Sequence, residues 1–162
     1  GTSFAKGLCY ALDIPLLAVD SLAALAVIAC EDRRAGLFHA ERWEEALLCP
    51  MIDARRMEVY AEVFDTSLER RSEVAAEVVT AASFGTFIRP GGEFFVFGSG
   101  AAKTLEVLPR DGVRFIDVQP SARGLCGLAQ ARLDAGEVED TAYFEPAYLK
   151  DFVVTAGRKK LF

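Results

Sequence analysis

The chain has 162 residues, 52% of them apolar, and a formal net charge of −6, which is enough for one ordinary domain or two small lobes with a real core. The acidic balance argues against a dedicated nucleic-acid groove, because phosphate binding needs clustered Lys and Arg. The four cysteines stand singly, without the Cys and His spacing of a zinc site, and are typical of reduced thiols in a cytoplasmic protein. Pro15 and Asp20 interrupt the apolar stretch of residues 14–30, so a membrane span is not predicted.

The beginning of the chain predicts two helices around a buried strand. Residues 1–12 carry apolar side chains at helical spacing, and "DIPLLAV" (13–19) is an apolar run typical of a buried strand. A second helix follows, with an N-cap at Asp20 or Ser21. Residues 31–46 are polar and predict a surface connector with a short helix.

The rest of the chain alternates strands with helices, which favours an α/β fold. Gly136 ends the last helix as a C-cap. Strands are predicted at 47–53 ("LLCPMID"), 57–65 ("MEVYAEVFD"), about 68–79, 93–97 and 113–118, and helices at about 80–88, 101–108 and 121–136.

One segment resembles a phosphate-binding turn. "FFVFGSGA" (94–101) reads as a strand, a glycine turn and a helix, an order that can hold phosphates on backbone N–H groups. It lacks the third glycine of the dinucleotide fingerprint and the Gly-Lys-Ser/Thr of a P-loop. Gly98, Ser99 and Gly100 are therefore candidates for a nucleotide contact, and a tight turn that packs a helix against a strand is the favoured alternative.

A charged cluster separates the first two strands of the alternating region. Asp53, Arg55, Arg56 and Glu58 could form an acid/base pair with an anion clamp. No apparent nucleophile accompanies them, however, and opposite charges at a strand turn are usually ion pairs or bonds to turn amides. His39 is the only histidine and lies in a polar segment, so we predict neither a catalytic role nor a metal site for it.

The first helix carries a strip of small residues. Gly1, Gly7 and Ala11 would let another helix approach closely, beside larger side chains at Phe4 and Leu8. A contact with a partner and a contact inside the chain's own fold fit this pattern equally well.

Four segments together resemble a known family. They are "AKGLCYALDIPLLAVDSLAALA", "PMIDARRMEVYAEVFD", "FFVFGSGA" and the closing "EPAYLKD". In this order and at these separations they resemble the TsaB (YeaZ) family of bacterial tRNA threonylcarbamoyladenosine biosynthesis proteins, in the glycoprotease-like ASKHA superfamily. The resemblance covers nearly the whole chain.

The resemblance implies an actin-like (ribonuclease H-like, ASKHA) fold of two lobes. Family members begin with three strands and a helix that precede residue 1 here, so we expect an incomplete N-terminal lobe, with the absent segment cut off, left out or replaced by a second copy. The expected division is the remainder of the N-terminal lobe (1–30), a surface connector (31–46), the C-terminal lobe with its helix at 121–136 (47–150), and a tail (151–162).

The resemblance also implies a function without catalysis in this chain. Family members pair with the TsaD subunit, which binds metal and ATP and transfers a threonylcarbamoyl group to N6 of adenosine 37 in ANN-decoding tRNAs, and the ATPase TsaE joins them. We therefore expect a cytoplasmic scaffold and activator that holds no cofactor or metal, with ATP and metal on TsaD and TsaE and only indirect tRNA contact. The residues agree, because a single histidine cannot supply the two metal-binding histidines that TsaD carries on one helix.

The implied site residues fall into two groups. A partner interface, with TsaD or in a homodimer through the same helix, is carried over to Ser3, Phe4, Gly7, Leu8 and Ala11. Asp53, Arg55 and Glu58 match the "IDAR…EVY" element of the family and are expected to determine the fold of the C-terminal lobe.

An enzyme remains the alternative from another class. It would be an actin-like ATPase or an M22-type glycoprotease-like peptidase that acts through the glycine turn and the Asp53 cluster. Micromolar ATP binding by this chain alone would favour it.

Overall fold

The structure is a computed structural model that describes residues 1–147 and 149. The predicted tail at 151–162 lies outside the described residues. In chain order, the elements are α1 (Thr2–Leu12), α2 (Ser21–Arg34), the 3₁₀ helix η1 (Trp43–Glu45), β1 (Leu47–Asp53), β2 (Glu58–Ala61), β3 (Phe64–Asp65), β4 (Ala75–Val78), β5 (Phe94–Phe97), the 3₁₀ helix η2 (Ala102–Thr104), β6 (Val113–Phe115) and α3 (Arg123–Asp134). The predicted α/β class is confirmed.

The strands form one mixed sheet in the order β4-β2-β1-β5-β6, with β3 beside β1. β1 pairs in parallel with β5, and β5 with β6, whereas β2 and β3 are antiparallel partners of β1. On that side of β1, Leu48 pairs with β3 and Met51 with β2. Pro50 falls between them, where its missing N–H costs no ladder bond.

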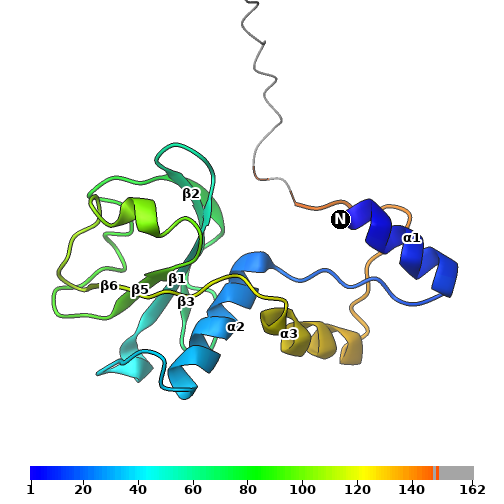
Figure 1. Cartoon of the computed structure of the whole chain (residues 1–162), viewed down its shortest axis with the longest axis horizontal. Helices are drawn as coiled ribbons and strands as arrows, with labels where there is room; N and C mark the ends of the chain where they lie inside the picture. The colour runs from blue at the N-terminus through cyan, green and yellow to red at the C-terminus, as the bar shows by residue number, and fades with distance from the viewer. Residues whose placement is uncertain (148, 150–162) are drawn as a thin grey trace, which may run out of the picture.

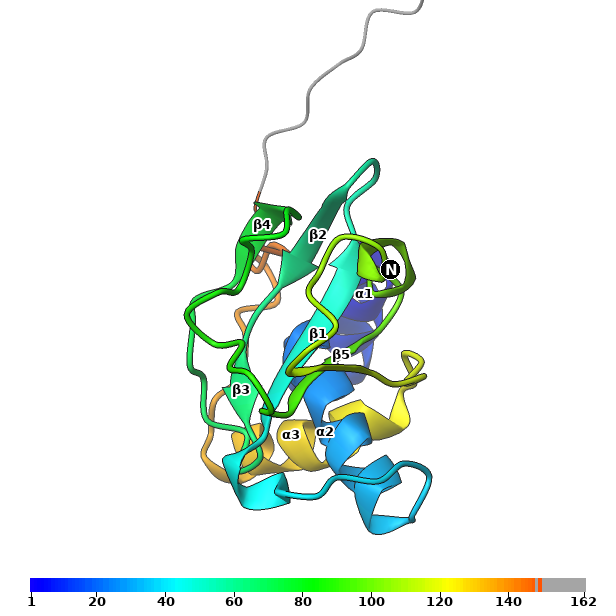
Figure 2. The same ribbon diagram turned by 90° about the vertical axis from the view of Figure 1, so that its left-hand side faces the viewer.

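Each face of the sheet has its own core. Alternate side chains of β5 point to opposite faces, so Phe95 and Phe97 pack toward α2 whereas Phe94 and Val96 pack on the other face. Figure 2 looks onto the sheet and shows α2 and α3 behind it. The near face is covered by the connections before and after β5, which contribute residues such as Leu108.

Helix α2 begins where the sequence predicts. The Asp20 carboxylate accepts hydrogen bonds from the N–H groups of Leu22 (2.7 Å) and Ala23 (3.4 Å) and so caps the helix. The helix runs to Arg34, farther than expected, and its buried face packs on β1 and on α3. Gly136 has a φ of 71° and follows α3 as the predicted C-cap glycine.

Three predicted strands differ from the structure. The run 13–19 is wrong as a strand, because a strand needs a paired neighbour and Leu16 makes one isolated bridge, to Glu139. The predicted strand 57–65 is divided into β2 and β3, since Val63 bonds instead to the loop at Ser72. Of the run 68–79, the structure has only β4 as a strand.

Two predicted helices are also wrong. Residues 80–88 form turns, and Phe84 has a positive φ of 59°, which a right-handed helix does not allow. Residues 101–108 contain the short 3₁₀ helix η2 in place of an α-helix.

Helix α1 stands apart from the sheet (Figure 1). Two runs of chain, residues 13–20 and 136–147, connect it to the body formed by the sheet, α2 and α3, and we call them together the arm. Among the described residues, the helices are too short or too polar for any of them to cross a membrane.

Candidate functional site

The predicted interface residues lie together on α1 and are all exposed. They are Ser3, Phe4, Gly7, Leu8 and Ala11. The Phe4 side chain is 72% exposed, which is unusual for a large apolar residue. A Cβ built on Gly7 meets nothing within 4 Å in the described part of the chain, so a second backbone has room to approach. Their contact with a partner stays a prediction.

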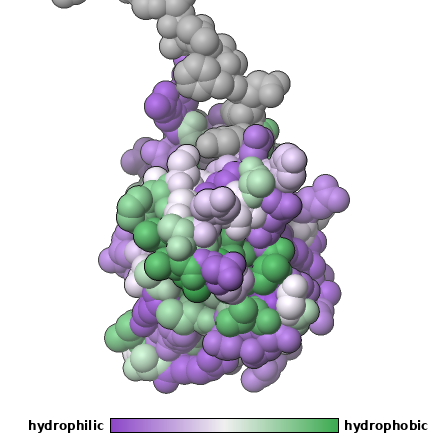
Figure 3. All heavy atoms as spheres, turned by 90° about the vertical axis from the view of Figure 1, so that its right-hand side faces the viewer, coloured by the Kyte–Doolittle hydropathy of each residue, from purple (hydrophilic) through white to green (hydrophobic). Residues whose placement is uncertain are grey.

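Further apolar side chains extend this surface beyond the predicted set. Tyr10 is 85% exposed, Leu12 61% and Tyr143, in the arm, 84%. Figure 3, which views the molecule from the α1 side, shows apolar side chains gathered in a band across this face. Helical spacing from Phe4 and Leu8 could have indicated Leu12, but no local pattern points to Tyr143.

Lys6 attaches α1 to the arm. Its ammonium donates hydrogen bonds to the carbonyls of Ala142 (3.1 Å) and Phe144 (2.9 Å), on either side of Tyr143. The Asp140 carboxylate accepts from the N–H groups of Ala142 and Tyr143, which fixes this turn. The backbone around Tyr143 is thus held against α1 by these bonds.

The charged turn between β1 and β2 is bonded within itself and to Lys103 of η2. The Asp53 carboxylate accepts hydrogen bonds from Lys103 and from the Arg55 N–H (2.8 Å), and these bonds hold its pKa below the ordinary value. Lys103 also donates to the Glu58 carbonyl. The geometry is that of a hairpin turn closed by an ion pair.

The backbone of this turn is unusual. Arg55 and Arg56 have φ angles of 68° and 48°, and the Glu58 N–H donates to the Arg55 carbonyl at 3.1 Å. Residues other than glycine rarely adopt a positive φ, so this backbone is held by the bonds around it. The expected role of Asp53, Arg55 and Glu58 in determining the fold stays a prediction.

The glycine turn after β5 packs tightly against β1. The Gly100 N–H donates to the Met51 carbonyl at 2.9 Å, and the Ala101 N–H donates to the Gly98 carbonyl at 3.1 Å. Gly98 has a φ of 93°, and a Cβ there would lie 2.5 Å from the Met51 oxygen. Ser99 accepts from the Asp53 N–H at 3.3 Å. A phosphate would have to compete with these bonds, and the nucleotide contact stays a prediction.

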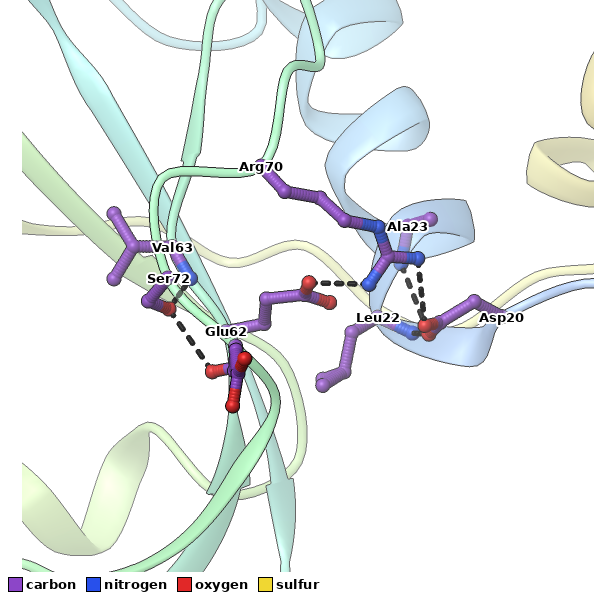
Figure 4. Close-up of polar contacts among 8 residues, drawn as sticks. Asp20, Leu22, Ala23, Glu62, Val63, Arg70 and Ser72 are labelled. Atoms are coloured by element: carbon purple, nitrogen blue, oxygen red, sulfur yellow. Dashed lines mark hydrogen bonds and ion pairs between the residues drawn. The ribbon is translucent and has the colours of Figure 1, made fainter. Parts of the chain in front are cut away.

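A buried acidic network escaped the sequence reasoning. The Glu62 side chain is fully buried between β2 and β3, and its carboxylate pairs with Arg70, which also contacts Asp20 at 3.0 Å (Figure 4). The second carboxylate oxygen of Glu62 is buried without a hydrogen-bond partner among the described residues. Burial raises the pKa of Glu62, and the positive charge of Arg70 offsets part of the rise. Glu62 alternates with Ala61 and Val63 as a solvent-facing strand residue would, so the sequence gives no local signal for its burial.

A hollow of about 770 Å³ lies near the start of β1 and β5. Its charged groups bond mostly to one another. Arg71 pairs with Asp65 at 2.5 Å, and Glu93 accepts from the backbone N–H groups of Glu41 (3.0 Å) and Arg42 (2.8 Å). We therefore assign no ligand to this hollow.

The single histidine does not join any of these groups. His39 is exposed in the connector after α2. Within residues 1–147 and 149, the structure brings together no three His, Cys, Asp or Glu side chains that could hold a metal ion.

Comparison with known proteins gives both family and structural matches. Residues 1–92 match the family described as TsaD: tRNA N6-adenosine threonylcarbamoyltransferase. No curated protein matches the chain.

Two solved structures from Pseudomonas aeruginosa are similar in fold. One, an uncharacterized protein with similarity to peptidase YEAZ, has a TM-score of 0.66 and 25% identity, with 92% of this chain and 65% of that chain covered. The other, YeaZ, has a TM-score of 0.67 and 25% identity, with 91% and 66% covered. This chain thus spans slightly less than two thirds of their length.

Proposed function

We propose, because the chain belongs to the family of TsaD, tRNA N6-adenosine threonylcarbamoyltransferase, that it is a non-catalytic subunit in the threonylcarbamoylation of adenosine 37 of ANN-decoding tRNAs. In this proposal α1 binds the catalytic TsaD subunit, and TsaE joins the pair. ATP and metal belong to those partners, tRNA contact is indirect, and the location is cytoplasmic.

The exposed apolar face of α1 is the observation that carries the proposal. Every residue of this helix is exposed or half-exposed, although Phe4, Leu8 and Leu12 are large and apolar. A contiguous apolar patch that is exposed to water often marks an interaction site of a protein. The helix also lies within residues 1–92, the range that matches the family.

The rest of the molecule supports a scaffold better than an enzyme. The charged turn uses Asp53 and Lys103 in bonds to each other and to the hairpin backbone. The 162 residues contain one histidine, His39, and it is exposed.

The test is size-exclusion chromatography with light scattering of this chain mixed with TsaD from the same organism. We expect a one-to-one complex that Phe4→Glu abolishes, because a buried unpaired carboxylate opposes association. Leu37→Glu is the matched control, since Leu37 is 71% exposed and lies outside α1. It should leave the complex intact.

Two results would overturn the proposal. One is a failure of the wild-type chain to bind TsaD, whether or not it forms a homodimer. The other is micromolar ATP binding by this chain alone, together with ATP turnover, which would favour an actin-like ATPase.

A further inference from the structure

The position of α1 depends on the arm more than on packing. Helix α1 buries none of its eleven residues in the described structure, so it lacks the apolar contact that normally fixes a helix on a core. In Figure 1, one run of the arm joins the end of α1 to the start of α2, and the other leaves the end of α3, crosses the first run and passes beside α1. They join each other through a hydrogen bond from the Glu139 N–H to the Leu16 carbonyl, of 2.8 Å.

One arginine of α3 contacts both runs of the arm. The Arg132 guanidinium donates to the Ala18 carbonyl in the first run. In the second run it lies 3.3 Å from a carboxylate oxygen of Glu139 and 3.4 Å from one of Glu137. A guanidinium suits this position because its donors point in several fixed directions in one plane.

Among the described residues, two further side chains hold the ends of the arm. Asp20 ends the first run as the cap of α2, and Lys6 holds the far end of the second run against α1. Between these ends, Leu16 is the large apolar residue that the first run buries, at 7% exposure. Arg132 therefore supplies the polar link between the middle of the arm and the body.

We propose that Arg132 is a positioning residue that sets where α1 stands relative to the body, and thereby controls partner binding without touching the partner. The second part rests on the proposed function of α1. When the arm is released, α1 is a helix of eleven residues with little support, and isolated helices of fewer than about 12 residues are marginal in water.

Hydrogen exchange of the chain alone tests the positioning. In Arg132→Met, we expect the α1 and arm amides to exchange about tenfold faster while the sheet keeps its protection, as local opening predicts. In Arg132→Lys, the exchange rates of these amides should lie between those of the wild type and Arg132→Met. One ammonium keeps the charge but cannot bond both the Ala18 carbonyl and the Glu139 carboxylate as the fork of guanidinium donors does.

Arg123→Met is the matched control on the same helix. Arg123 pairs with Asp32 and Glu31 of α2 and, in the part of the chain that the structure describes, makes no hydrogen bond or ion pair with the arm. This variant should change exchange in α2 and α3 and leave α1 as in the wild type.

The outcomes separate this inference from the proposed function. Unchanged α1 exchange in a folded Arg132→Met variant overturns the positioning role, as does equal acceleration by Arg123→Met. If Arg132→Met does not fold, Arg132→Lys decides by the same criterion.

Pairing with the partner is measured separately. If α1 is correctly placed for a tenth of the time, the apparent Kd for the partner rises about tenfold. If the wild-type chain does not bind TsaD, the proposed function is overturned, but the positioning role tested by hydrogen exchange is unaffected.

Discussion

Gly124 of α3 lies directly against the carbonyl of Ala24 in α2. A Cβ built on Gly124 would overlap that oxygen and would lie 2.8 Å from the Ile28 side chain. Because the oxygen belongs to a helix backbone, it cannot move aside easily. We expect Gly124→Ala to destabilise the protein by about 2 kcal/mol, in the range of overpacked cores. Urea denaturation measures this loss.

The same substitution one turn later, at Gly127, should change stability in the opposite direction. A Cβ on Gly127 would point into open space among the described residues, at an exposed position inside α3. Alanine is the better helix former, so Gly127→Ala should stabilise the protein by about 0.5–1 kcal/mol. Equal losses from the two variants would show that α3 does not pack on α2 through Gly124.

Arg70 compensates the buried charge of Glu62. In Arg70→Met the Glu62 carboxylate, in a residue that is 1% exposed, would lose its partner. Arg70 itself is half-exposed, so water moderates the effect, and we expect a loss of about 2 kcal/mol at pH 8.

Two further variants check the origin of that loss. Adding Glu62→Gln to Arg70→Met should recover most of it, because the buried charge is then absent. Arg71→Met removes the neighbouring arginine, whose partners Asp65 and Glu69 are nearer the surface, and should cost about 1 kcal/mol or less. A double variant no more stable than Arg70→Met alone would contradict the assignment.

Glu62 should also contribute to the pH dependence of stability. Burial raises its pKa in the folded protein, so the folded state holds this proton more tightly than the unfolded chain. Its contribution to stability is therefore greatest below the ordinary glutamate pKa, about 4.3, and falls as pH rises through the raised folded value. Wild type should lose stability relative to Glu62→Gln across this interval.

Denaturation of both proteins between acid and neutral pH gives this difference directly. The carboxylates of Asp53, Asp65 and Glu93 have lowered pKa values, so their contributions run in the opposite direction and are lost as pH falls. They are present in both proteins and cancel. A difference that stays constant, or that favours wild type more at higher pH, would show that Glu62 is not desolvated.

The sequence predicts elements well where local pattern and packing agree. β1 has the predicted bounds 47–53, and α3 lies within the predicted 121–136, because each has a clear apolar pattern and a recognisable end. The run 13–19 has the composition of a buried strand, but composition does not show whether a neighbouring strand is there to pair with it. Phe84 breaks a predicted helix through a backbone angle that its residue type does not announce.

The residues of the candidate sites also differ in whether a local sequence pattern indicates them. Helical spacing places Phe4 and Leu8 on one face of a helix, but it does not show whether that face is exposed or packs inside the fold. Arg132 and Arg70 could not be predicted, since each joins segments that are far apart in the sequence, and local patterns carry no information about which distant groups meet. The apolar face of α1 is thus readable from sequence, whereas the contacts that hold it in place are not.

Burial should order the reactivity of the four cysteines. Cys126 is exposed and Cys9 half-exposed, whereas Cys30 and Cys49 are buried. The thiolate is the reactive form, and burial raises the pKa of both Cys30 and Cys49. Burial therefore lowers the thiolate fraction of these two residues and also their access to reagent.

In a pulse of iodoacetamide at pH 8, followed by peptide mass analysis, Cys126 should react first, Cys9 next, and the buried pair only after unfolding. In concentrated guanidinium all four should react at similar rates. Labelling of Cys49 in the folded protein as fast as Cys126 would mean that β1 is not the buried centre of the sheet, because Cys49 lies in that strand with no exposed surface.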